Sequence, residues 1–139
     1  MRFIDLILIH CSAVRPNQRS RKADIDRWHR ARGWKGCGYH YVIDRDGNIE
    51  EGRPLNMIGA HCKGYNRHSI GICYEGGLDE NGRPADTRTE AQKVAMRQLL
   101  ERLHAEFPLA IIAGHSDYNP MKACPCFNAE NEYRDLQPK

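Results

Sequence analysis

The sequence lacks any uninterrupted apolar segment approaching the roughly 20 residues that span a bilayer, which argues against insertion into a membrane. Its first ten residues lack the basic start, long apolar centre and small-residue cleavage site of a secretion signal. We therefore expect a chain that is cytoplasmic as synthesised. The sequence also lacks repeats, linkers and low-complexity tracts, so residues 1–139 are expected to form one domain around one core.

Charge of neither sign dominates, because 21 Lys and Arg residues face 18 Asp and Glu residues. A net charge of +3 permits attraction to nucleic acid or to bacterial wall polymer but identifies neither. The basic residues between positions 15 and 27 lie around one loop and helix without clustered stacking aromatics, which argues against a nucleic-acid-binding protein. Six cysteines without an export signal indicate reduced thiols and a metal ligand among them.

The apolar patterning predicts an α/β fold, a central mixed β-sheet flanked by helices. Two short apolar runs are expected to be central strands and a third an inner strand: 3–10, 109–113 and 69–74. A turn at Asp46-Gly47 predicts a peripheral hairpin over 39–51. Helices are expected over three stretches: 20–32 with Trp28 anchoring its buried face, a capping box at Thr87 and Glu90 through 107, and 128–136 capped by Asn128.

Histidines end both of the apolar runs expected at the centre of the sheet. His10 closes the first run, and His115 follows the second. A buried core histidine with a polar partner is the alternative for each one alone, but the pair favours metal ligands. If the strands are parallel neighbours, their carboxyl ends bring the two imidazoles together. Side chains alternate along a strand, so only one of His10 and Cys11 should face this site.

The loop after His115 supplies sulfur and a cation. Cys124 can fold back as a third ligand, which leaves the fourth zinc position for water, as in a hydrolase. Cys126 can instead join it in a closed structural site. Lys122 favours the open site, because an ammonium there can stabilise the oxyanion formed when a carbonyl is attacked. No HExxH helix is present, so a tyrosine of the sheet or zinc-bound hydroxide would have to manage the proton.

Four segments follow one another along the chain: IHCSA at 9–13, GYHYVIDRDGNIEEGR at 38–53, GAHCKGYNRHSIGIC at 59–73 and KACPCF at 122–127. Together they resemble the zinc-dependent N-acetylmuramoyl-L-alanine amidases, and within that family the T7 lysozyme-like phage endolysins. The resemblance implies the fold those endolysins share with peptidoglycan-recognition proteins. It also implies hydrolysis of the amide joining N-acetylmuramic acid to L-alanine of the peptidoglycan stem peptide. Such an enzyme is expected to act on the cell wall after release or through a pore.

The resemblance also implies roles for single residues. Its zinc ligands fall on His10, His115 and Cys124, and its catalytic helpers on Tyr39 and Lys122. The histidine of the GAH segment, His61, is expected to line the substrate cleft, and we expect Asn66 of the same polar link to bind substrate beside it.

The chain departs from those endolysins in the loop that carries sulfur. The spacing from His115 to Cys124 is one residue longer, and Cys126 stands where a residue that does not bind metal is usual. A recognition module that binds the glycopeptide without cutting it is the alternative on the same fold. Such modules lack the zinc cysteine, and this chain has it.

Overall fold

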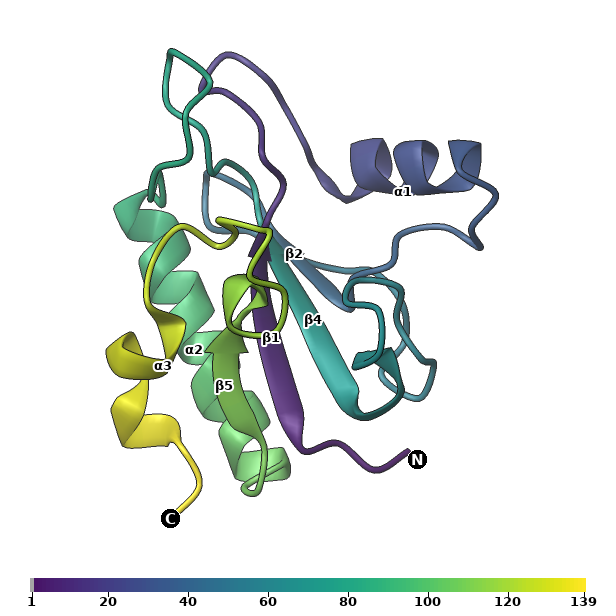
Figure 1. Ribbon diagram of the computed structural model, residues 1–139, viewed down its shortest axis with the longest axis vertical. Coiled ribbons are helices and arrows are strands. Elements are labelled where there is room, and N and C mark those ends of the chain that lie inside the picture. Colours follow the sequence, from purple (N-terminus) through teal and green to yellow (C-terminus); the bar gives the residue numbers. More distant parts are fainter. Residues whose placement is uncertain (1) are drawn as a thin grey trace.

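A five-stranded mixed sheet forms the centre of the computed structural model, which describes residues 2–139 (Figure 1). The strands lie in the order β3-β2-β4-β1-β5, and β3 alone among them pairs antiparallel. The main elements are β1 (Leu6–Cys11), α1 (Lys22–Ala31), β2 (Tyr41–Ile43), β3 (Ile49–Glu51), β4 (Ser69–Tyr74), α2 (Glu90–Glu106), β5 (Ile111–Gly114) and α3 (Ala129–Glu132). Short 3-10 turns are η1 (Asn66–His68), η2 (His115–Asp117) and η3 (Arg134–Leu136). No helix within residues 2–139 has the length and apolar character needed to cross a membrane.

The expected adjacency of the first and last strands is confirmed. β1 and β5 pair in parallel, with Leu6 opposite Ile111 and Ile9 opposite Gly114. Two details differ from the expectation. β5 lies at the edge of the sheet, because β4 takes the place on the other side of β1. The first strand begins at Leu6 and not at Phe3, whose side chain is 67% exposed.

The alternation of side chains in β1 assigns the two faces of the sheet. Ile7 and Ile9 pack with α2 in the main core, whereas Leu6 and Leu8 pack on the opposite face. His10 continues the second series and is buried there. Figure 1 shows α2 lying along one side of the sheet, while α1 lies beyond β2. His10 therefore lies on the face of the sheet that α2 leaves free.

Two expectations about the helices were wrong in detail. In α1 the buried residues are Ile25 and His29, while Trp28 is 40% exposed. The capping box of α2 is formed by Thr89 and Gln92, not by Thr87 and Glu90, so the helix starts later. Along α2 the buried positions are Gln92, Ala95, Met96, Leu99, Leu100 and Leu103. The sequence of α2 has apolar side chains on several sides of the helix, so more than one apolar face is compatible with it. Packing against the sheet selects the face that is buried.

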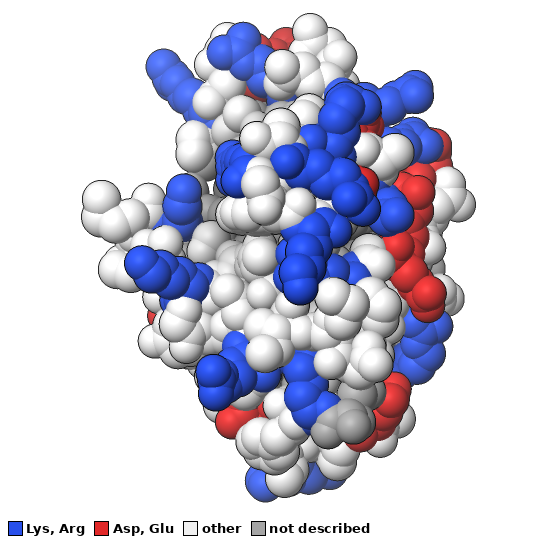
Figure 2. Space-filling view, turned by 90° about the vertical axis from the view of Figure 1, so that its right-hand side faces the viewer, with Lys and Arg blue, Asp and Glu red and all other residues white. Residues whose placement is uncertain are grey.

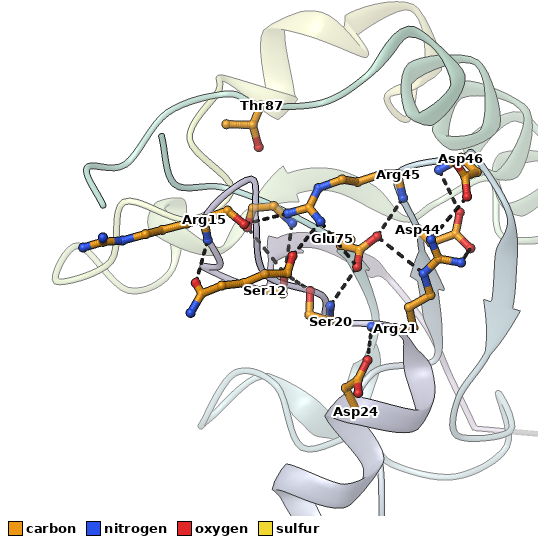
Figure 3. A network of polar contacts seen from close by, with 12 residues as sticks. Ser12, Arg15, Ser20, Arg21, Asp24, Asp44, Arg45, Asp46, Glu75 and Thr87 are labelled. Carbon is orange, nitrogen blue, oxygen red and sulfur yellow. Dashed lines mark hydrogen bonds and ion pairs between the residues drawn. The ribbon is translucent and has the colours of Figure 1, made fainter. Parts of the chain in front are cut away.

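A buried carboxylate fixes the loop that follows β1. Glu75 lies directly after β4 and accepts hydrogen bonds from the backbone N–H groups of Ser20, at 2.7 Å, and Arg45, at 2.9 Å. The guanidinium groups of Arg21 and Arg45 lie 3.8 and 3.7 Å from its oxygens, and Arg21 also pairs with Asp44 (Figure 3). The network ties the start of α1 and the β2–β3 turn to the same end of the sheet.

Replacing Glu75 with alanine is expected to lower the free energy of unfolding by about 2–6 kcal/mol. Two backbone N–H groups lose their acceptor, at about 1–3 kcal/mol for each buried group left unsatisfied. Urea unfolding followed by circular dichroism measures the change. Glu80→Ala, at an exposed position, is the control and should stay within about 0.5 kcal/mol of wild type. An equally small change in Glu75→Ala would contradict the role given to the network.

Candidate active site

The parallel ends of β1 and β5 bring two imidazoles together. His10 is the fifth residue of β1, and His115 begins the turn η2 directly after β5. Their Nδ1 atoms lie 3.1 Å apart, and the ring centroids are separated by 4.4 Å. His10 is buried and His115 partly exposed, so the pair lies at the inner end of an accessible site.

The loop after His115 folds back and carries sulfur to the same place. The N–H of Ser116 donates to the carbonyl of Cys124 at 2.8 Å, and the N–H of Cys11 donates to the Cys124 sulfur at 2.9 Å. The close approach depends on Gly114, since a Cβ there would lie 2.6 Å from Pro125. One ligand atom from each of His10, His115 and Cys124 lies within 4.8 Å of the others.

This donor set fits a tetrahedral metal with nitrogen and sulfur ligands. Two nitrogens bound to one tetrahedral zinc lie about 3.3 Å apart, close to the 3.1 Å between the Nδ1 atoms of His10 and His115. Burial lowers the pKa of both imidazoles, and the Lys122 ammonium lowers that of His115 further. Lowered pKa values keep both rings neutral, the form that binds a metal.

Cys126 lies outside this cluster of three in the part of the chain the structure describes. Its sulfur contacts the carbonyl oxygen of Gly77 at 3.4 Å, and its backbone has a φ of 72°. All six cysteines, each within residues 2–139, are free thiols. His10, His115 and Cys124 therefore lie together, as the open site requires, whereas the Cys126 sulfur contacts Gly77.

Tyr39 lies next to the cluster. Its ring centroid is 5.1 Å from that of His10 and 6.4 Å from that of His61. Burial holds the pKa of the Tyr39 hydroxyl well above its ordinary value, and the thiols of Cys73 and Cys124 act in the same direction. The hydroxyl therefore keeps its proton at neutral pH, and the Tyr39 ring lies beside the cluster of His10, His115 and Cys124.

A cleft of about 320 Å³ opens onto the cluster. Its walls come from α1, the loop after it, the polar link 60–66 and the last loop: His29, Arg32, Trp34, Tyr39, Ala60, His61, Cys62, Lys63, Asn66, His115 and Lys122. Lys122 is exposed.

Figure 2 shows that Lys and Arg side chains gather over the side of the molecule that carries α1, with the acidic ones mainly along its edge. Among residues 2–139 the cleft walls contain three cations and no carboxylate, so anionic substrate groups are favoured there.

The sequence analysis assigns no role to His29, which lines the cleft and is buried. Its Nδ1 accepts a hydrogen bond from the N–H of Gly38 at 2.8 Å, and its ring packs on Trp34 at 4.6 Å. The two bulky rings at positions 28 and 29 differ by 100° around the helix, and the apolar pattern assigned the wrong one to the inside.

His61 and Asn66 both line the cleft, and both are also used within the protein. The side-chain oxygen of Asn66 accepts from the N–H groups of His61, at 2.9 Å, and Cys62, at 2.8 Å. The Nδ1 of His61 lies 2.9 Å from the Nε2 of His10. This contact joins the cleft wall to the cluster directly.

Comparisons with known proteins agree with this geometry. Residues 1–127 match the family described as N-acetylmuramoyl-L-alanine amidase. The chain is 43% identical over 124 residues to the endolysin of Escherichia phage T7, an alignment that covers 89% of this chain and 82% of the relative. The structure of the amidase LysCS from Clostridium intestinale superposes with a TM-score of 0.82 and 29% identity over 99% of this chain and 86% of that one.

A third similar structure contains a ligand. It is the ectodomain complex of peptidoglycan recognition proteins LCa and LCx bound to tracheal cytotoxin, with a TM-score of 0.71 and 29% identity. The alignment covers 88% of this chain and 75% of that one. The fold is therefore shared by proteins named for cutting peptidoglycan and by proteins named for recognising it.

Proposed function

This chain belongs to the N-acetylmuramoyl-L-alanine amidase family and hydrolyses the amide between N-acetylmuramic acid and L-alanine in peptidoglycan, and we propose that it does so with zinc held by His10, His115 and Cys124. The observation that supports this best is the meeting of two neutral imidazoles and one sulfur within 4.8 Å, beside the cleft that His115 lines. We further propose that residues 1–139 form one catalytic domain, which acts on the wall after release from the cell that makes it.

Zinc is the metal that this donor set favours. Thiolate sulfur and imidazole nitrogen suit zinc, whereas calcium and magnesium prefer oxygen ligands. When bound, zinc would supply Lewis-acid polarisation of a carbonyl and acidify water at the position that the protein leaves open. Two neutral imidazoles and one thiolate leave a net single positive charge there, so a further cation nearby adds to the electrophilic character of the site.

Lys122 and Tyr39 are the proposed catalytic residues. The Nζ of Lys122 carries a positive charge at the cleft mouth, beside His115, where an oxyanion forms when the amide carbonyl is attacked. The Tyr39 hydroxyl stays protonated and can donate to the same oxygen or to the leaving amine. His61 and Asn66 shape the wall against which the muramyl peptide lies.

Removing the metal is expected to abolish hydrolysis. The purified chain is incubated with peptidoglycan, with and without a zinc chelator, and newly freed alanine amino termini are counted. Chelation should lower their release to background, and added zinc should restore it, because three protein ligands reassemble the site. Calcium or magnesium added instead should leave the release at background. Full release from protein with a zinc content far below one per chain would contradict the proposal.

A further inference from the structure

The imidazole of His61 lies between a proposed metal ligand and the sheet, and both of its ring nitrogens have partners. Its Nδ1 is 2.9 Å from His10 Nε2, and its Nε2 is 3.2 Å from the hydroxyl oxygen of Ser69. The rings of His10 and His61 meet edge to face, with centroids 4.9 Å apart. A side chain whose two polar atoms are engaged within the protein offers substrate mainly its carbon edge.

The hydrogen-bond directions follow from the metal-facing atom of His10. Its Nδ1 faces His115 and needs a free lone pair to bind a metal, so the proton lies on Nε2. That N–H donates to His61 Nδ1, which places the His61 proton on Nε2, from where it donates to Ser69 Oγ. One set of tautomers thus satisfies the whole row from the cluster to β4.

Close packing keeps the His61 ring in place. A Cβ added at Gly71 of β4 would lie 2.6 Å from the ring, and one added at Gly59 would lie 2.7 Å from it. The backbone N–H of His61 is held by Asn66 Oδ1 at 2.9 Å. Both glycines leave the space that the ring fills, so the ring has little freedom to turn away from His10.

We infer that His61 is a positioning residue that fixes the tautomer and orientation of His10 for metal binding, in addition to lining the cleft. The inference rests on the proposed zinc site. Partners of this kind are usually carboxylates or carbonyls, which donate negative charge toward the metal. A neutral imidazole orients His10 without that charge, and so leaves the positive charge of the site undiminished.

The test is zinc affinity measured by competition with a chromogenic chelator, without substrate. Asparagine places its Oδ1 where histidine has Nδ1, so His61→Asn keeps an acceptor for His10. Glutamine places its amide near the Nε2 position, so His61→Gln keeps the contact toward Ser69 and loses the one to His10. We expect His61→Gln and His61→Ala to weaken zinc binding by about 10–100-fold, and His61→Asn to stay within about threefold of wild type.

Zinc affinities equal to wild type in both His61→Gln and His61→Ala, with only a higher KM, would overturn the inference and leave a substrate-binding role. Equal weakening of zinc binding in all three His61 variants would also overturn it, because the acceptor that His61→Asn keeps for His10 would then make no difference. Urea unfolding of the zinc-free proteins identifies any variant that fails to fold. In that case Ser69→Ala, which removes the hydrogen-bond partner of His61 Nε2, should weaken zinc binding severalfold. If the wild-type chain itself binds no zinc, the proposed zinc site is wrong, and this result is distinct from a failure of the role inferred for His61.

Discussion

Cys124→Ser is expected to bring zinc from about one per chain to near zero and to lower amidase activity at least about 10³-fold. The loss follows because a Lewis acid supplies several kcal/mol of transition-state stabilisation, and each 1.4 kcal/mol is a factor of ten. The Cys124 sulfur is the one thiol that lies within reach of the nitrogens of His10 and His115 among residues 2–139. Metal content of the purified protein, measured beside alanine release from peptidoglycan, checks both parts.

Cys126→Ser is the matched control, because it removes a thiol two residues away from the same loop. The Cys126 sulfur contacts the Gly77 carbonyl at 3.4 Å, and a serine hydroxyl can donate to the same oxygen. We expect zinc content and activity to match those of wild type. A variant that lost zinc as completely as Cys124→Ser would show a closed four-ligand site, and the open hydrolytic site would be wrong.

The part of the site that the sequence predicts best is the part that depends on the sheet. Two short apolar runs, each followed by a histidine, indicate parallel strands whose carboxyl ends meet. The alternation of side chains then separates His10 from Cys11: Cys11 packs in the main core with α2, whereas His10 contacts Tyr39 on the other face. For β1 the local apolar pattern carries this information, because burial on both faces leaves a strand few other places in a sheet, whereas β5 lies at the edge.

The parts that the sequence did not predict depend on contacts between distant segments. Nothing in the local pattern indicates that His61 reaches His10, 51 residues away, over a glycine of β4. Likewise, the choice of His29 over Trp28 for the inside of α1 depends on the Gly38 N–H that needs an acceptor. Such hydrogen bonds form only when two loops meet, so a pattern read along one segment contains no trace of them.

Lys122→Met is expected to lower kcat by about 10²–10³-fold while leaving zinc content unchanged. The ammonium is expected to stabilise charge that develops only in the transition state, and one such donor contributes about 3–4 kcal/mol. Lys122 is exposed and lines the cleft together with His115, whose pKa is lowered by burial and by the Lys122 charge. Steady-state kinetics on a soluble muramyl peptide give kcat and KM separately.

Lys63→Met is the control for a general loss of positive charge, because Lys63 also lines the cleft and is exposed. Its ammonium is not expected to meet the developing oxyanion, so kcat should remain within about twofold and any loss should be in KM. Lys122→Arg keeps the charge but changes the donor geometry, so its kcat should fall between wild type and Lys122→Met. Equal effects of Lys63→Met and Lys122→Met on KM, with kcat intact in both, would reduce Lys122 to one of several cations that attract an anionic substrate.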